Sequence, residues 1–249
     1  MFPDITIFPD WLDDEADAIE KRNILNLLII NGSPRTYGAT GKILTYIGKK
    51  LCELNPQLEI THVNLGDYNL KLCVGCMACY KTGDCIIQDD GVENLCRLIE
   101  QCDGVVFGTP TYASNVSGHF KILIDRGHFV FEQLLSNKAC FSVVTYENAG
   151  GNKSQNIVNE LIHFSGGSVC GQYRKKLNHG SEPLDKATQK SIDKECVRYL
   201  RRAKRKTPLS ISERVMRAIV FNLGLRGHAL KNPTRYKAVI SIWKNKGYI

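Results

Sequence analysis

The stretch ILNLLIINGSPRTYGATGKILTYIGKKLCEL, residues 24–54, decides the fold class. Residues 24–30 form a short apolar run that ends at Asn31-Gly32, as expected of a central strand buried on both faces. Between residues 38 and 54 the apolar positions recur at helical spacing, on Ile43, Leu44, Ile47 and Leu51. A buried strand followed at once by an amphipathic helix predicts an α/β domain with a parallel sheet.

The same alternation continues along the chain. Further strands are predicted at residues 58–63, 104–108, 139–145 and 167–173, and helices at residues 91–101, 117–126 and 153–165. Five strands in this pattern predict a doubly wound, flavodoxin-like parallel sheet with the order 2-1-3-4-5. In that order the loops after strands 1, 3 and 4 converge on one crevice. These loops are residues 32–40, 109–117 and 146–152.

The two ends of the chain differ from this core. Residues 1–173 hold 13 Lys and Arg against 20 Asp and Glu, a charge of −7, whereas residues 174–249 hold 20 against 5, a charge of +15. We divide the chain into an N-terminal extension (1–22), a flavodoxin-like domain (23–180) and a basic helical C-terminal extension (181–249). Such a basic region suits an acidic partner, nucleic acid, an anionic membrane surface or a solvated helix face.

Composition and sequence pattern indicate the cellular compartment in which the protein is expected. Of the 249 residues, 43% are hydrophobic, which is ordinary for a globular protein with a buried core. No apolar run approaches the roughly 20 residues that cross a bilayer, and the acidic start lacks the pattern of a secretory signal. We therefore expect a cytoplasmic protein without a transmembrane segment, and without structural disulfides.

The loop after the first strand, residues 31–40, has the features of an anion site. Its glycines and hydroxyl residues leave backbone N–H groups free at a helix N-terminus, and Arg35 adds positive charge. The spacing of a magnesium-dependent P-loop is absent, as is G-x-G-x-x-G. A mononucleotide phosphate bound without magnesium remains, with an ordinary strand-to-helix turn as the alternative.

The loops after strands 3 and 4 suit a planar ring. Thr109-Pro110-Thr111-Tyr112 places a stiff turn and an aromatic side chain at the crevice, and Gly150-Gly151 allows close approach of main chain from the other side. Lys121, Asp125 and Arg126 share the following helix, and we expect structural ion pairs among them.

The stretch CVGCMACYKTGDC, residues 73–85, holds four of the ten cysteines, Cys73, Cys76, Cys79 and Cys85, in the loop after strand 2. Their compact spacing resembles ferredoxin ligand runs more than the two separated knuckles of a zinc site. An unoccupied thiol loop is the further alternative. The other cysteines, expected as small buried hydrophobes, are Cys52, Cys96, Cys102, Cys140, Cys170 and Cys196.

NGSPRTYGAT (31–40), CVGCMACYKTGDCIIQDD (73–90) and GTPTYASNVSGHFKILIDR (108–126) together resemble the flavodoxin-like NAD(P)H-dependent FMN reductase superfamily, specifically its iron–sulfur flavoprotein branch. The resemblance covers about residues 24–175. It implies that FMN and a [4Fe–4S] cluster are the cofactors and that the four cysteines of residues 73–85 are the cluster ligands. Ala39 departs from the pattern, since relatives often carry Asn there.

The residues that this resemblance implies for FMN fall into two groups. The phosphate group would contact Ser33, Arg35, Gly38, Ala39 and Thr40. The flavin ring would contact Pro110, Thr111, Tyr112, Asn115, Val116, Tyr146, Glu147, Gly150 and Gly151. No side chain stands out as a general acid or base, so no catalytic residue is predicted.

The resulting hypothesis is an FMN-dependent oxidoreductase with NAD(P)H as the electron donor and the cluster, or a small acceptor such as a quinone, as the electron acceptor. One alternative is a non-enzymatic electron carrier with a ferredoxin-like partner, and another is a cluster-free FMN reductase. The resemblance also implies a homo-oligomer. The basic segment 198–206 lacks a recognised nucleic-acid-binding fold, so no nucleic-acid partner is expected.

Overall fold

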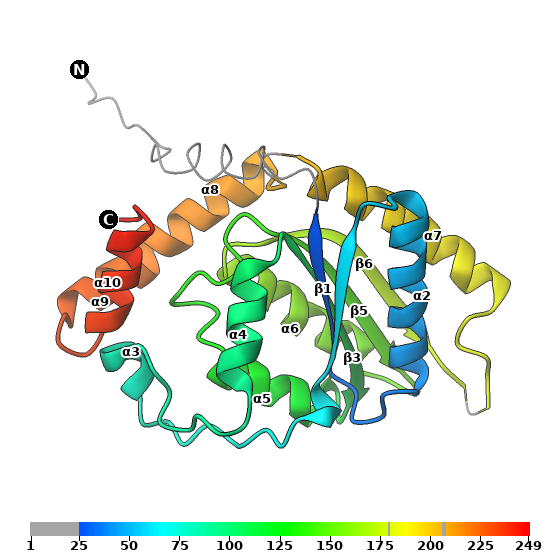
Figure 1. Cartoon of the computed structure of the whole chain (residues 1–249), viewed down its shortest axis with the longest axis horizontal. Helices are drawn as coiled ribbons and strands as arrows, with labels where there is room; N and C mark the ends of the chain where they lie inside the picture. Colours follow the sequence, from blue (N-terminus) through cyan, green and yellow to red (C-terminus); the bar gives the residue numbers. More distant parts are fainter. Residues whose placement is uncertain (1–24, 179, 206–207) are drawn as a thin grey trace.

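The computed structural model describes residues 25–178, 180–205 and 208–249. A twisted parallel sheet runs through its centre, with helices on both faces and a helical C-terminal segment at one side (Figure 1). The predicted N-terminal extension, residues 1–22, lies outside the described residues. No described helix is long and apolar enough to cross a membrane.

Five parallel strands form the sheet in the order β2-β1-β3-β5-β6. Their bounds are β1 Asn26–Asn31, β2 Glu59–Asn64, β3 Gly104–Tyr112, β5 Ala139–Tyr146 and β6 Ser168–Lys176. In β1, Leu27 to Ile30 are all buried, which explains the continuous apolar run in the sequence. The predicted fold class and the order of the five parallel strands are confirmed.

The strand count differs from the prediction by one short element. β4 (Asn115–Val116) turns back and pairs antiparallel with the end of β3, placing Val116 opposite Thr111. The sheet therefore has six strands, and β3 runs four residues past its predicted end. Two residues carry too little pattern to predict a strand, because alternation needs a longer run.

Two helices cover one face of the sheet and three cover the other. α2 (Ala39–Leu54) and α7 (Lys186–Ala203) pack on the first face, together with Leu27 and Ile29. α4 (Val92–Gln101), α5 (Gly118–Arg126) and α6 (Gly151–Phe164) pack on the second. Because α7 shares the core of α2, this part of the predicted C-terminal extension lies directly on the sheet.

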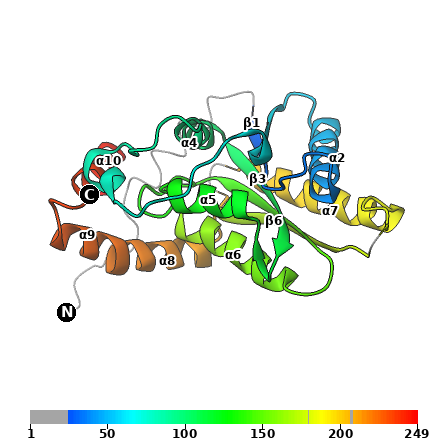
Figure 2. The ribbon, with the colours of Figure 1, turned by 90° about the horizontal axis from the view of Figure 1, so that it is seen from below.

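The segment after α7 crosses the molecule instead. It contains α8 (Ile211–Ile219), a π-helical turn (Val220–Arg226), α9 (Gly227–Lys231) and α10 (Lys237–Asn245). α8 passes alongside α6, and α10 lies next to the short helix α3 (Ala78–Thr82), as Figure 2 shows. A separate aromatic cluster holds this end together, with Trp243 fully buried at its centre.

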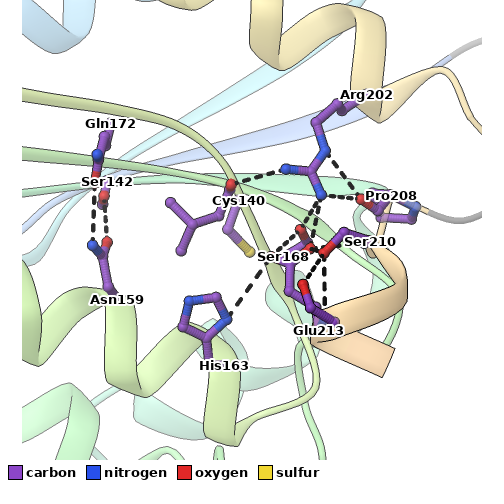
Figure 3. Close-up of polar contacts among 12 residues, drawn as sticks. Cys140, Ser142, Asn159, His163, Ser168, Gln172, Arg202, Pro208, Ser210 and Glu213 are labelled. Carbon is purple, nitrogen blue, oxygen red and sulfur yellow. Dashed lines mark hydrogen bonds and ion pairs between the residues drawn. The ribbon is translucent and has the colours of Figure 1, made fainter. Parts of the chain in front are cut away.

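The start of α8 is attached to the sheet by a polar cluster, drawn in Figure 3. Glu213 accepts hydrogen bonds from Ser168 at 2.7 Å and from the Arg202 guanidinium at 2.9 Å. It also completes a capping box with Ser210. Burial alone would raise the pKa of Glu213, but these hydrogen bonds lower it below its ordinary value.

Candidate functional site

A cavity of about 350 Å³ lies at the carboxyl ends of β1, β3, β5 and β6. This is the edge at which open α/β sheets bind ligands, and the volume falls in the usual range for small-molecule pockets. The lining residues are Ser33, Arg35, Gly38, Ala39, Thr40, Pro110, Thr111, Tyr112, Thr145, Tyr146, Glu147, Leu177, Asn178, Gly180 and Ser181.

One end of the cavity is the N-terminus of α2. Gly38 is the N-cap of this 16-residue helix, no side chain caps it, and its first turn holds no acidic residue. The first N–H groups of an α-helix have no partners within the helix, and the helix dipole places partial positive charge beside them. This end of the cavity therefore suits an anion, and the buried Thr40 hydroxyl lies in the same wall.

Hydrogen bonds between residues close in sequence fix the shape of the loop before α2. Asn31 accepts from the Ser33 amide at 3.0 Å, and the Ser33 hydroxyl accepts from the Arg35 amide at 3.1 Å. Ser117, the N-cap of α5, donates its hydroxyl to the Gly32 carbonyl. A side chain at Gly32 would contact Phe120 at 2.9 Å, which accounts for glycine there. The loop is thus held in place before any ligand arrives.

Another part of the cavity wall is formed by the end of β3. Pro110, Thr111 and Tyr112 line it, and Tyr112 is 43% exposed, which leaves its ring available for stacking. The Thr111 hydroxyl donates to Ser154 on α6 at 3.0 Å. β4 pairs with this stretch from the far side, so the wall is fixed by backbone as well as side-chain contacts.

Most of the residues predicted for FMN meet around this cavity, but four do not line it. Asn115 and Val116 form β4 behind the wall. Gly150 has φ +85° and lies so close to Ser114 that a Cβ would be 2.5 Å from its Cα. Gly151 is covered by the Tyr146 ring, which a Cβ would meet at 2.5 Å. These four support the lining residues and do not form the surface of the cavity.

Five lining residues were not predicted. The Thr145 hydroxyl is hydrogen-bonded to the Thr40 hydroxyl, with the two oxygens 2.7 Å apart. Leu177, Asn178, Gly180 and Ser181 follow β6 and close one side of the cavity. The sequence did contain a signal for them, because all parallel strands end at the same edge and the loop after strand 5 therefore reaches the crevice too.

The four clustered cysteines lie in the connection between β2 and α4, as predicted. All four are free thiols; Cys73 and Cys76 are exposed, and Cys79 and Cys85 are half-buried. The loop turns through left-handed residues at Gly75, Met77 and Gly83. Within residues 25–178, 180–205 and 208–249, no three His, Cys, Asp or Glu side chains form a group that could hold a metal ion.

The chemistry of the loop nevertheless fits an iron–sulfur cluster. The donors are four soft thiols, and positive charge lies next to two of them. Arg126 donates to the Cys85 sulfur at 3.5 Å. Burial alone would lower the pKa of His128, but hydrogen bonds with Cys79 and Glu132 raise it to about 10. Cations beside sulfur favour the thiolate form that iron requires.

Aromatic contacts join this loop to the C-terminal segment. Tyr80, next to Cys79, stacks on Tyr236 with ring centroids 5.6 Å apart and packs against Phe131 at 4.7 Å. Burial, as the main cause, raises the pKa of Tyr80 to about 12. Arg235 contacts the Met77 sulfur. The cysteine helix α3 is therefore covered by Phe131 and, from the C-terminal segment, by Tyr236 and Arg235.

Of the cysteines outside the loop, Cys102, Cys140, Cys170 and Cys196 are buried, as predicted. Cys96 is half-buried, and burial raises its pKa to about 12. The prediction was wrong for Cys52, which is exposed. It directly follows the buried Leu51 on α2 and lies about 100° further around the helix, at the edge of the buried face.

Comparison with known sequences gives one family. A family model described as NADPH-dependent FMN reductase matches residues 25–174. An iron–sulfur flavoprotein of Clostridioides difficile (strain 630) is 38% identical over 223 residues, which are 90% of this chain and 99% of that protein. An iron–sulfur flavoprotein of Archaeoglobus fulgidus is 29% identical over 231 residues, covering 88% of this chain and 98% of the relative.

Solved structures share the fold. An NADH:FMN oxidoreductase in its apo form superposes with a TM-score of 0.53 at 14% identity, covering 76% of this chain and 94% of that one. The azoreductase AzrA gives a TM-score of 0.53 at 13% identity, covering 72% and 98%. At these identities the likeness concerns the arrangement of strands and helices.

Proposed function

Because the chain belongs to the NADPH-dependent FMN reductase family, we propose that its strand-end cavity binds FMN and that the protein is an NAD(P)H-linked FMN-dependent oxidoreductase. The observation that carries the proposal is that the uncapped N-terminus of α2 and the Pro110–Tyr112 wall line the same cavity. FMN has two matching parts, a phosphate and a planar ring, joined by a ribityl chain. When bound, FMN supplies hydride acceptance and one-electron transfer.

At the phosphate end the chain contributes hydrogen-bond donors. The amides of Gly38, Ala39 and Thr40 and the Ser33 and Thr40 hydroxyls bind the phosphate, and Arg35 adds a charge-assisted contact. Because Ala39 carries no polar side chain, its contribution is limited to its amide. Acidic side chains are absent from the first turn of α2, so nothing there repels a dianion.

At the ring end the chain orients the cofactor and keeps water from one side. Pro110, Thr111 and Tyr112 form one wall, and Tyr146 and Glu147 form another. Asn115, Val116, Gly150 and Gly151 hold those walls in place from behind. The Thr111 side chain is held by its bond to Ser154, so Thr111 would keep a fixed position beside a bound ring.

We further propose that Cys73, Cys76, Cys79 and Cys85 hold a [4Fe–4S] cluster, which supplies one-electron transfer. The cations beside Cys79 and Cys85, His128 and Arg126, support this assignment. Electrons then leave either through this loop or to a small acceptor such as a quinone. A homo-oligomer, as in our interpretation of the sequence, stays a prediction.

The test is anaerobic reduction of the FMN-loaded protein by NADH and by NADPH, followed as bleaching of the flavin band in a stopped-flow instrument. Rapid bleaching with either nucleotide supports the proposed donor. Bleaching by dithionite but by neither nucleotide would rule it out.

A second candidate function is supported by one observation, the charge of +15 on residues 174–249. A surface of this sign suits an acidic ferredoxin-like partner, and the protein would then be an electron carrier rather than an NAD(P)H oxidoreductase. Reduction by ferredoxin that slows strongly with added salt, together with negligible NAD(P)H oxidation, distinguishes this function from the first.

A further inference from the structure

Arg126, the last residue of α5, is buried against the cysteine loop. Its side chain is 1% exposed. One terminal nitrogen donates to the Lys71 carbonyl at 3.0 Å and forms an ion pair with Asp90. The other donates to the Ile87 carbonyl at 2.7 Å and to the Cys85 sulfur at 3.5 Å. All four acceptors belong to residues 71–90, so a single guanidinium holds the whole loop.

The same ion pair closes the loop at its neck. Asp90 accepts the Lys71 amide at 2.7 Å, while the Lys71 ammonium pairs with Asp89 at 2.6 Å. The first and last residues of the loop therefore meet at the carboxylate that faces Arg126. Asp90 is also 1% exposed, and its pKa is lowered despite burial, chiefly through the hydrogen bond from Arg126.

The position of α5 gives this contact a second consequence. Its N-cap, Ser117, donates to the Gly32 carbonyl in the loop proposed for the FMN phosphate and accepts from the Phe120 amide. Its last residue reaches Cys85. Nine residues of helix span about 13 Å, so one rigid element joins the two loops that carry the proposed cofactors.

We propose that Arg126 is a positioning residue for the proposed cluster, holding Cys85 in place and raising the reduction potential by its hydrogen bond to the sulfur. The inference depends on the cluster assigned under Proposed function. Reduction adds one electron to the cluster without making or breaking a bond, so negative charge on the sulfurs rises. A buried cation that donates to one of those sulfurs stabilises the reduced form more than the oxidised form.

A simple structural ion pair would not need this geometry. One terminal nitrogen pairs with Asp90 and the Lys71 carbonyl, and the other reaches past them to Ile87 and Cys85. The Arg126 Nε atom is buried and has no hydrogen-bond partner among the described residues, which leaves donor capacity unused next to the loop. Lysine has no planar fork and reaches fewer of these acceptors at once.

The experiment uses the full chain, loaded with FMN and reconstituted anaerobically with ferrous iron and sulfide. The variants are R126Q and R126K, with K121A as the control, because Lys121 makes an exposed ion pair with Asp125 on the same helix. For each protein we measure FMN, iron and sulfide per chain and the midpoint potential of the cluster signal in an EPR-monitored titration.

We expect K121A to match the wild type and R126Q to bind normal FMN. The reduction equilibrium of R126Q should shift about tenfold toward the oxidised form, which is about 59 mV for one electron. R126K should lie between the two. An R126Q protein that loses iron while keeping FMN also supports the inference. In that case the midpoint potential of the cluster is measured on R126K instead.

Wild-type potential in a fully loaded R126Q protein would overturn the inference while leaving the cluster itself in place. If R126Q cannot be reconstituted with iron and sulfide, a wild-type midpoint potential in R126K would overturn the inference. A wild-type protein that binds FMN but takes up no iron would instead contradict the cluster proposed above, and the role of Arg126 with it. If R126Q and R126K both lose FMN while K121A keeps it, Arg126 acts on folding alone, and the inference fails.

Discussion

Replacing Gly41 by alanine should weaken FMN binding while leaving the domain folded. Gly41 lies in the first turn of α2, directly under the loop proposed for the phosphate. A Cβ there would be 1.8 Å from the Thr36 carbonyl oxygen and 3.1 Å from the side-chain nitrogen Nδ2 of Asn31. The first contact is with backbone, so the loop before α2 must move to accommodate the new methyl group.

The size of the effect follows from where this strain is relieved. Overpacking by one carbon costs about 1–3 kcal/mol. The roughly 0.5–1 kcal/mol that alanine gains in helix propensity is the same with and without FMN, so it does not change the affinity. Hydrogen bonds hold residues 31–35 of this loop, but Tyr37, next to Thr36, is exposed, so without ligand residues 36 and 37 can shift at little cost. Binding requires the original shape, and the strain then appears in the affinity. At 1.4 kcal/mol per factor of ten, the dissociation constant should rise by about 5-fold to about 140-fold.

The assay is titration of apoprotein with FMN, followed by quenching of flavin fluorescence, with thermal unfolding measured in parallel. G48A is the matched control, because it lies in the same helix but its Cβ would meet only side-chain atoms, the nearest being His62 Nε2 at 2.9 Å. We expect G48A to bind FMN normally. Equal dissociation constants for G41A and the wild type would refute the assignment of this loop to the phosphate.

Three further predictions concern the remainder of the molecule. C79S should bind FMN but no iron after reconstitution, whereas C52S, at an exposed cysteine outside the loop, should bind both. Iron is measured per chain, and full iron in C79S would contradict the ligand assignment. W243A should destabilise the C-terminal segment by about 3–5 kcal/mol and expose it to limited proteolysis, unlike F164A at an exposed site; equal cleavage would show that the buried Trp243 is dispensable. The pKa of Glu213 is lowered from 4.5, so its stabilisation is present above that pH and is lost as the pH falls through the lower folded-state value. E213Q should therefore have a lower free energy of unfolding at neutral pH, and that free energy should fall less steeply as the pH is lowered. An acid denaturation curve identical to that of the wild type would contradict this.

The parts of the fold that the sequence predicts are those with a local signal. Residues 24–30 are apolar without interruption because β1 is buried on both faces, and Ile43, Leu44, Ile47 and Leu51 recur because one side of α2 lies on the sheet. The helix predicted over residues 117–126 is present as α5, and Ser117 is its N-cap, with a side chain that accepts from the Phe120 amide. Connection rules for parallel strands then gave the strand order and the edge with the cavity.

The parts that could not be predicted depend on contacts between distant residues. Lys121 and Asp125 pair within their helix as expected, but Arg126 pairs with Asp90, 36 positions away, and no periodicity indicates such a partner. The stacking of Tyr80 on Tyr236 likewise joins two segments that are far apart in the sequence. Long-range side-chain contacts follow from the folded arrangement, so a local pattern contains no trace of them.

FMN binding is measured most directly by the visible spectrum of the purified chain after incubation with FMN and removal of free flavin. We expect a yellow protein with one FMN per chain, because the uncapped α2 N-terminus and the Pro110–Tyr112 wall line a single cavity. A colourless protein that retains no FMN would contradict it.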